Sequence, residues 1–152
     1  MKGILLAGGT GSRLRPLTEV TNKHLLPVGN KPMIMHGISK FVESDIKDIM
    51  IVTDSSHMTS LASFLGSGKR FNCDITYKVQ DEPNGIGGAL KLCEAFVGKE
   101  DFIVILGDNM FQEPLSKTID KFREIKEETP DLPVCVLNLI KVKDPQRFGI
   151  AT

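Results

Sequence analysis

The chain has 152 residues, of which 41% are hydrophobic and 25% charged, and this composition predicts one soluble globular domain rather than two full domains. The net charge is zero, but residues 1–40 carry six basic side chains and a single acidic one, so their net charge of +5 is balanced by −5 over the remainder. Because glycines are concentrated in the same region, this basic excess favours an anion-binding site over a merely solvated basic face.

Two other classes of protein are excluded by the sequence. Cys73, Cys93 and Cys135 are widely spaced and form no CxxC or histidine-containing metal spacing, so we expect neither a disulfide framework nor a zinc site. No apolar run approaches the roughly 20 residues of a membrane span, and Met1 and Lys2 lead directly into a strand rather than a signal peptide. We therefore expect a cytoplasmic protein whose partners include neither a membrane nor nucleic acid.

Strands alternate with helical patterns along the chain. Apolar or alternating runs predict strands at residues 4–7, 49–53, 74–79, 102–106 and 134–140, with a further strand opening at 147–152. Helical spacing and capping residues predict helices at 32–44, from the caps at 54–56 to 65, at 88–97, and from about 114 to 129. Residues 21–30 are expected to form an extended loop, because Pro27 and Gly29 argue against regular structure.

Two of the predicted strands differ in their burial pattern. Residues 74–79 alternate apolar and polar side chains, as a strand with one buried face near a sheet edge does, whereas residues 102–106 are apolar throughout, which is typical of a central parallel strand. The regular alternation of strands and helices predicts an α/β fold. We expect a doubly wound, mainly parallel Rossmann-like sheet with helices on both faces.

The turn after the first strand has the chemistry of a polyphosphate site. Gly8, Gly9 and Gly11 allow backbone N–H groups to approach phosphate oxygens closely, since no Cβ intervenes. Arg13 and Arg15 follow with fixed positive charge and forked donors. The sequence therefore predicts that this turn holds an anion.

Unusual residues also follow the other strands. Thr53 and Asp54 end the second strand, Gln80 follows the third, and residues 107–109 follow the fourth. In an open parallel sheet, the loops beyond the carboxyl ends of the strands converge on one rim, and ligands bind in that crevice. We therefore expect four loops to face one ligand, with Asp108 placed to hold Mg²⁺ against phosphate oxygens.

Other nucleotide-binding turns fit less well. A dinucleotide GxGxxG pattern that starts at Gly9 would need glycine where Leu14 stands, which disfavours a dinucleotide-dependent dehydrogenase. A Walker loop is excluded because no Gly-Lys-Ser/Thr occurs in the chain. His24, His36 and His57 have no spacing relation to each other or to a nucleophile, and we interpret them as structural.

Several ordered motifs carry a resemblance to a known family. The motifs lie at residues 6–18, 23–28, 31–33, 79–89 and 105–111. They resemble the signature of the sugar-nucleotide pyrophosphorylases, and within that family the thymidylyltransferases are the most similar. The resemblance implies transfer of a thymidylyl group from dTTP to a sugar 1-phosphate, with glucose 1-phosphate as the expected sugar and pyrophosphate as the second product. It also implies that residues 1–152 form the nucleotide-binding part of a nucleotidyltransferase domain.

The resemblance further implies roles for individual residues. Arg13 would hold the β- and γ-phosphates, and Lys23 would contact the α-phosphate or the sugar phosphate, so both are catalytic candidates. Gln80 would bind the pyrimidine edge beside Pro83 and Gly85. Asp108 would be one of two aspartates that hold Mg²⁺, and Gly149 would approach the sugar. The remaining implied nucleotide-binding residues are those of the first strand's end and the turn: Leu6, Ala7, Gly8, Gly9, Thr10, Gly11 and Ser12.

The chain departs from the family pattern in two ways. Residues 86–89 read Ile-Gly-Gly-Ala where thymidylyl members usually have Leu-Ala-Gln-Ala, which leaves UTP as an alternative to dTTP. Family members also continue past residue 152 to a sugar-binding segment and a second Mg²⁺ aspartate. Three alternatives follow: a truncated thymidylyltransferase, one half of a split enzyme, or a nucleotide-binding fragment without turnover. We also expect a homo-oligomer or a complementing C-terminal half, because the sheet edge would otherwise be exposed.

Overall fold

A computed structural model describes residues 1–9, 11–144 and 146. The chain divides into two compact units, Met1–Gln112 and Glu113–Thr152, and each is described by itself. Thr10, Gly149 and the strand expected at 147–152 lie outside the described residues.

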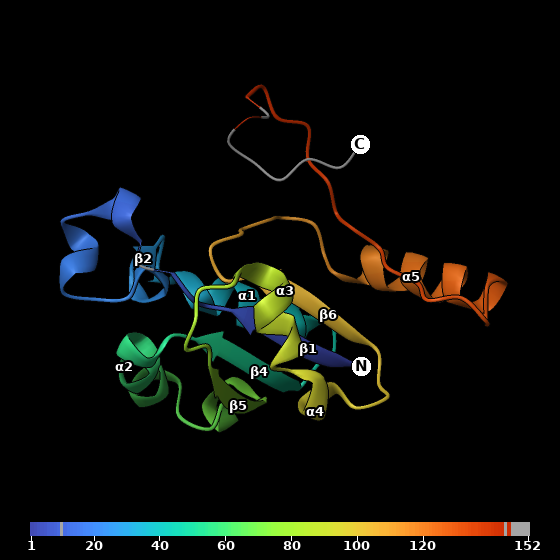
Figure 1. Ribbon diagram of the computed structural model, residues 1–152, viewed down its shortest axis with the longest axis horizontal. Helices are drawn as coiled ribbons and strands as arrows, with labels where there is room; N and C mark the ends of the chain where they lie inside the picture. Colours follow the sequence, from blue (N-terminus) through green and yellow to red (C-terminus); the bar gives the residue numbers. More distant parts are fainter. Residues whose placement is uncertain (10, 145, 147–152) are drawn as a thin grey trace. The chain divides into compact units, whose positions relative to one another are not determined.

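A four-stranded parallel sheet forms the centre of the first unit (Figure 1). It consists of β1 (Lys2–Leu6), β4 (Asp48–Thr53), β5 (Asp74–Val79) and β6 (Phe102–Leu106), in the order β5-β4-β1-β6. Leu6 lies opposite Val52 of β4 and Leu106 of β6, so the strands end at a common level. The predicted α/β fold with a parallel sheet is confirmed.

Helices α1 (Met33–Glu43) and α2 (Ser55–Leu65) cover one face of this sheet. Gly37 brings α1 close to β1, since a Cβ at this position would lie 2.7 Å from Leu5 Cδ1. Asp54 caps α2 as expected, because its side chain accepts a hydrogen bond from the backbone N–H of His57 at 3.1 Å. Both predicted helices are therefore confirmed, with bounds that differ by at most a residue or two.

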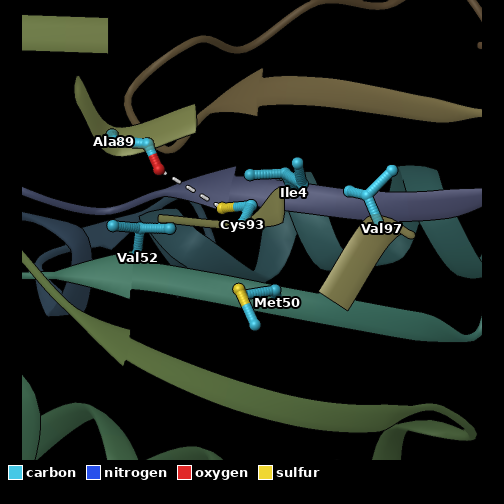
Figure 2. Packing of buried hydrophobic residues seen from close by; sticks show 6 residues of the cluster. All are labelled: Ile4, Met50, Val52, Ala89, Cys93 and Val97. Carbon is cyan, nitrogen blue, oxygen red and sulfur yellow. Dashed lines mark hydrogen bonds between the residues drawn. The ribbon is translucent and has the colours of Figure 1, made fainter. Parts of the chain in front are cut away.

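The opposite face is covered by α3 (Gly85–Lys91) and α4 (Glu94–Val97). The sequence predicted one helix at 88–97; the segment is largely helical, but the expectation of a single continuous helix was wrong. The backbone N–H of Cys93 bonds to Leu90 O at 2.9 Å, while the Cys93 thiol donates to Ala89 O at 3.4 Å, so the helical ladder is interrupted between the two helices. Figure 2 shows the buried cluster that joins these helices to the sheet: Ile4, Met50, Val52, Ala89, Cys93 and Val97.

Residues 21–30 are more regular than expected. They contain a 3-10 turn, Lys23–Leu25, and β2 (Pro27–Val28), which pairs antiparallel with β3 (Lys31–Pro32). Gly29 has a φ of 65°, which glycine adopts without strain and which allows this tight hairpin. The prolines are tolerated because the ladder is only two residues long.

Two expectations for the later strands were wrong. β6 pairs only with β1 among the described residues, so it is an edge strand and not a central one. Within the described part of the chain, residues 134–140 form no strand. Apolar composition alone does not make a strand, because the backbone groups also need a neighbouring strand to bond.

The second unit contains α5 (Ser116–Glu128), which agrees with the helix expected from about 114 to 129. Thr118 Oγ1 and the Asn138 side chain exchange hydrogen bonds at 2.9–3.0 Å, which ties the helix to the segment after it. Among the helices that the structure describes, none combines the length and the apolar character that crossing a membrane requires.

Candidate functional site

Backbone hydrogen bonds draw the four strand ends into one rim. Ala7 N donates to Val52 O at 2.7 Å, Gly107 N to Leu6 O at 2.8 Å, and Gln80 N to Thr53 O at 2.8 Å. The loops after β1, β4, β5 and β6 therefore leave the sheet side by side. The predicted convergence is confirmed, and the rim is the place where an open parallel sheet binds its ligand.

The glycine turn after β1 has the backbone shape that glycine permits. Gly9 and Gly11 have φ values of 99° and 60°, and Thr18 Oγ1 donates to Gly11 O at 2.8 Å. A Cβ on Gly11 would lie 2.8 Å from Thr18 Cγ2 and 3.1 Å from Lys23 Cβ, whereas a Cβ on Gly8 would meet no atom within 4 Å. Gly11 is therefore required by packing, while Gly8 leaves open space above the turn.

The side chains around this turn form two groups, one buried beneath the turn and one exposed to solvent. Ala7 is fully buried, and its carbonyl accepts from the buried Thr53 Oγ1 at 3.1 Å. Leu6 packs against the cluster of Figure 2. Ser12 and Arg13 open a 3-10 turn, Ser12–Leu14, and both are exposed. Arg13 forms no hydrogen bond or ion pair with any residue that the structure describes, so its guanidinium is available to an anion.

Lys23 and Asp108 meet at the rim. Lys23 Nζ lies 2.7 Å from Asp108 Oδ2, with the two side chains 17% and 45% exposed. Partial burial acts to raise the pKa of Asp108, but the hydrogen bond and the positive charge of Lys23 outweigh it, so this pKa lies below its ordinary value. The structure therefore holds an ionised carboxylate next to a cation at the position where phosphates are expected.

His24 lies behind this pair and is 1% exposed. Burial, followed by the charge of Lys23, lowers the pKa of His24 to about 4. Asn22 Oδ1 accepts from His24 N at 2.7 Å and lies 2.8 Å from His24 Nδ1, so the amide oxygen orients the ring. The Asn22 Nδ2 group is buried without a partner among the described residues. A Cβ on Gly107 would lie 2.7 Å from His24 Cδ2, so the ring supports the loop that carries Asp108.

Gln80 follows β5 at the rim, as predicted. Its Nε2 donates to Asn84 Oδ1 at 2.6 Å and to Gly85 O at 3.3 Å. Pro83 and Gly85 are exposed beside it, and Gly85 has a φ of 80° at the start of α3. The structure thus brings Gln80, Pro83 and Gly85 together in one loop.

The residues fit one part of a magnesium site. No group of three or more His, Cys, Asp or Glu side chains able to hold a metal occurs in the described ranges. Asp108 supplies an ionised, partly exposed oxygen ligand, and Mg²⁺ is held in many sites by one or two carboxylates together with water and phosphate oxygens. Asp108 therefore fits as one ligand of the ion.

Sequence reasoning missed four residues with a structural part in the site. Thr18 holds the glycine turn, Asn22 orients His24, and Asn84 binds the Gln80 amide. A Cβ on Gly88 would coincide with the Asn84 side chain. The spacing of Asn84 four residues after Gln80 was visible, but the contact depends on the turn between β5 and α3, which the pattern did not define.

An open parallel sheet with helices on both faces, and with a glycine turn and an exposed arginine at its carboxyl rim, defines the chain as an α/β protein of the Rossmann-like class. The profile of the nucleotidyl transferase family matches residues 2–152, and the chain belongs to this family.

Relatives of this chain include named enzymes. A glucose-1-phosphate thymidylyltransferase of Neisseria meningitidis is 36% identical over 151 residues, which cover 99% of this chain and 50% of the relative. A candidate glucose-1-phosphate thymidylyltransferase from Bacillus anthracis, crystallised with sucrose, is 56% identical to this chain in sequence. Its structure matches with a TM-score of 0.79 over 82% of this chain and 50% of that one. An apo UDP-glucose pyrophosphorylase is 25% identical, with a TM-score of 0.71 over 83% and 56%. The chain spans about half the length of the relatives it matches.

Proposed function

We propose that this chain carries the nucleotide-binding part of a nucleotidyltransferase that transfers a thymidylyl group from dTTP to a sugar 1-phosphate. Glucose 1-phosphate is the proposed acceptor, because the thymidylyltransferase relatives carry that name. The observation that supports the proposal most is the Lys23–Asp108 ion pair. It lies at the carboxyl rim of the sheet, where the glycine turn also lies.

The proposed reaction needs little acid–base chemistry. The attacking oxygen of a sugar 1-phosphate is already anionic, so catalysis depends on aligning two anions that repel each other and on neutralising the charge that develops. Arg13 would bind the β- and γ-phosphates and the departing pyrophosphate, and Lys23 would neutralise the α-phosphate. Asp108 would hold Mg²⁺, which supplies charge neutralisation at the phosphate oxygens when it is bound.

UTP is the second candidate nucleotide. Gly88 stands where thymidylyl members usually have Gln, and UDP-glucose pyrophosphorylases share the fold with TM-scores of 0.68 and 0.71. We also propose a cytoplasmic location. The free edge of β6, which pairs with no further strand among the described residues, supports a second copy or a complementing C-terminal half as the partner.

Calorimetric titration with dTTP and Mg²⁺, followed by addition of glucose 1-phosphate in a pyrophosphate-release assay, tests the proposal. Binding with product supports a complete enzyme, and binding without product supports a nucleotide-binding fragment or one half of a split enzyme. The proposal is contradicted if the chain binds neither dTTP nor UTP. If turnover is present, Arg13→Ala should lower it by roughly 10²-fold, which is the scale of losing one preorganised charge donor.

A further inference from the structure

The amide of Gln80 is held in a single orientation. Its Nε2 donates to Gly85 O at 3.3 Å, and a backbone carbonyl is an acceptor only, so the atom that faces it is the nitrogen. The same nitrogen donates to Asn84 Oδ1 at 2.6 Å. Both amide hydrogens are therefore occupied within the loop. Gln80 Oε1 accepts no hydrogen bond from the residues that the structure describes, and it is the group left for a ligand.

Asn84 has an unusual role for its position. It precedes the first residue of α3, where an Asn side chain ordinarily caps the helix, but its side chain makes no capping hydrogen bond. The side chain oxygen bonds to Gln80 Nε2 instead. Asn84 thus gives up a capping bond and fixes the Gln80 amide.

Gly88 makes this arrangement sterically possible. A Cβ at Gly88 would overlap sterically with Asn84 Oδ1 and would lie 2.8 Å from Asn84 Nδ2. Any larger residue at this position must therefore displace the Asn84 side chain. Gly87, its neighbour in α3, is different, since a Cβ there would meet no atom within 4 Å. Gly88 also stands at the position where the chain departs from the usual Leu-Ala-Gln-Ala sequence.

We propose that Asn84 and Gly88 are positioning residues, which present the Gln80 side chain to a nucleotide as a hydrogen-bond acceptor only. They thereby set the preference of the chain among pyrimidine bases. Uracil and thymine carry an N–H donor at N3, which complements Gln80 Oε1. Cytosine carries an unprotonated acceptor at N3, and it would leave two acceptors facing each other. The proposal rests on the proposed function, because it takes Gln80 as the residue that meets the base.

Competition between dTTP and 5-methyl-dCTP measures this preference directly. The two nucleotides share the sugar, the triphosphate and the methyl group, and they differ only at the base edge. We expect Asn84→Ala to lower the dTTP preference roughly tenfold, the scale of one lost hydrogen bond. Asn84→Asp should retain the preference, because a carboxylate oxygen still accepts from Gln80 Nε2 even if its charge weakens the binding of both nucleotides.

Substitutions at Gly87 and Gly88 of α3 separate positioning from stability. Gly87→Ala and Gly88→Ala both favour a helix, and Gly87→Ala should raise the Tm by roughly 2–4 °C. Only Gly88→Ala should lower the dTTP preference, again roughly tenfold, without a fall in Tm that would explain the loss. A purely structural role of Gly88 would change Tm and leave the preference intact.

NMR of the nucleotide-free chain tests the orientation independently of any ligand. The side-chain NH₂ signals of Gln80 should exchange more slowly with solvent than those of the exposed Gln112, and Asn84→Ala should abolish the difference. Equal preference in all variants would overturn the proposal while the proposed function stands. If the unmodified chain binds neither dTTP nor UTP, the proposed function and the base preference are overturned together. Fast exchange at Gln80 would overturn the fixed orientation itself.

Discussion

Lys23 Nζ lies 2.7 Å from Asp108 Oδ2, although the two residues are 85 positions apart in the chain. One belongs to the turn before β2, and the other follows β6 directly. The contact places a cation and an ionised carboxylate at the carboxyl rim of the sheet. Their opposite charges satisfy each other in the free chain, and phosphate and metal would compete for them in a complex.

Lys23→Met should affect chemistry much more than stability. The pair is half-exposed on its Asp108 side, so its loss should change the free energy of unfolding by less than about 1 kcal/mol. Turnover, where it is present, should fall by roughly 10²-fold. Urea unfolding and pyrophosphate release measure the two effects. Lys47→Met is the control, because Lys47 pairs with Asp45 at 2.9 Å at the other end of the sheet. Unchanged turnover with a large stability loss would make Lys23 structural.

His24 should make stability depend on pH. Its pKa of about 4 in the folded chain lies below the ordinary value of 6.5, so the unfolded chain binds a proton that the folded chain does not. The free energy of unfolding should therefore fall as the pH drops from 6.5 to about 4, with a slope of at most about 1.4 kcal/mol per pH unit. Urea unfolding across this interval measures it. His24→Gln should flatten the dependence, and an equal slope in that variant would assign it to other groups.

The lowered pKa of Asp108 affects stability in a lower pH range than the pKa of His24 does. A carboxylate whose pKa is lowered on folding stabilises the protein above its ordinary pKa, and this contribution is lost as the pH falls through the folded value. Its effect therefore begins near pH 3.8 and below. Measurements of the free energy of unfolding above pH 4 therefore separate the contribution of His24 from that of Asp108.

Gly8 and Gly11 of the glycine turn should respond differently to substitution by alanine. Gly11→Ala places a Cβ at a φ of 60° and against Thr18 Cγ2, so it should destabilise the fold by about 1–3 kcal/mol. Gly8→Ala meets nothing within 4 Å in the free chain, and its stability should change by less than about 0.5 kcal/mol. Gly8→Ala should instead weaken dTTP binding, because the new methyl group occupies the space above the turn. Calorimetric titration and urea unfolding give both values, and the same pattern for both variants would contradict the assignment.

The sequence allowed the sheet and the rim to be predicted, because both depend on local signals. Buried runs and capping residues define β4 and α2, and parallel topology then brings the strand ends together. The placement of β6 could not be predicted. An apolar strand is compatible with the centre or the edge of a sheet, and only its pairing decides between them.

Local patterns also missed the contacts that complete the site. The Gln80–Asn84 hydrogen bond depends on the turn before α3, and the burial of His24 depends on the packing of Gly107 against its ring. Neither feature has a periodic signal. The strand-end argument predicted Asp108 for the rim and the family resemblance implied Lys23 for the same site, but the direct ion pair between them required the structure.

Binding of dTTP to the Arg13→Ala variant tests the central claim, that the glycine turn and its exposed arginine bind a nucleoside triphosphate. Arg13 is exposed and has no partner among the described residues, so the variant should keep the stability of the unmodified chain. Isothermal titration with dTTP and Mg²⁺ should show an affinity at least roughly tenfold lower than in the unmodified chain. Arg123→Ala, on the exposed surface of α5, should bind normally. Equal affinity of the Arg13→Ala variant and the unmodified chain would contradict the account.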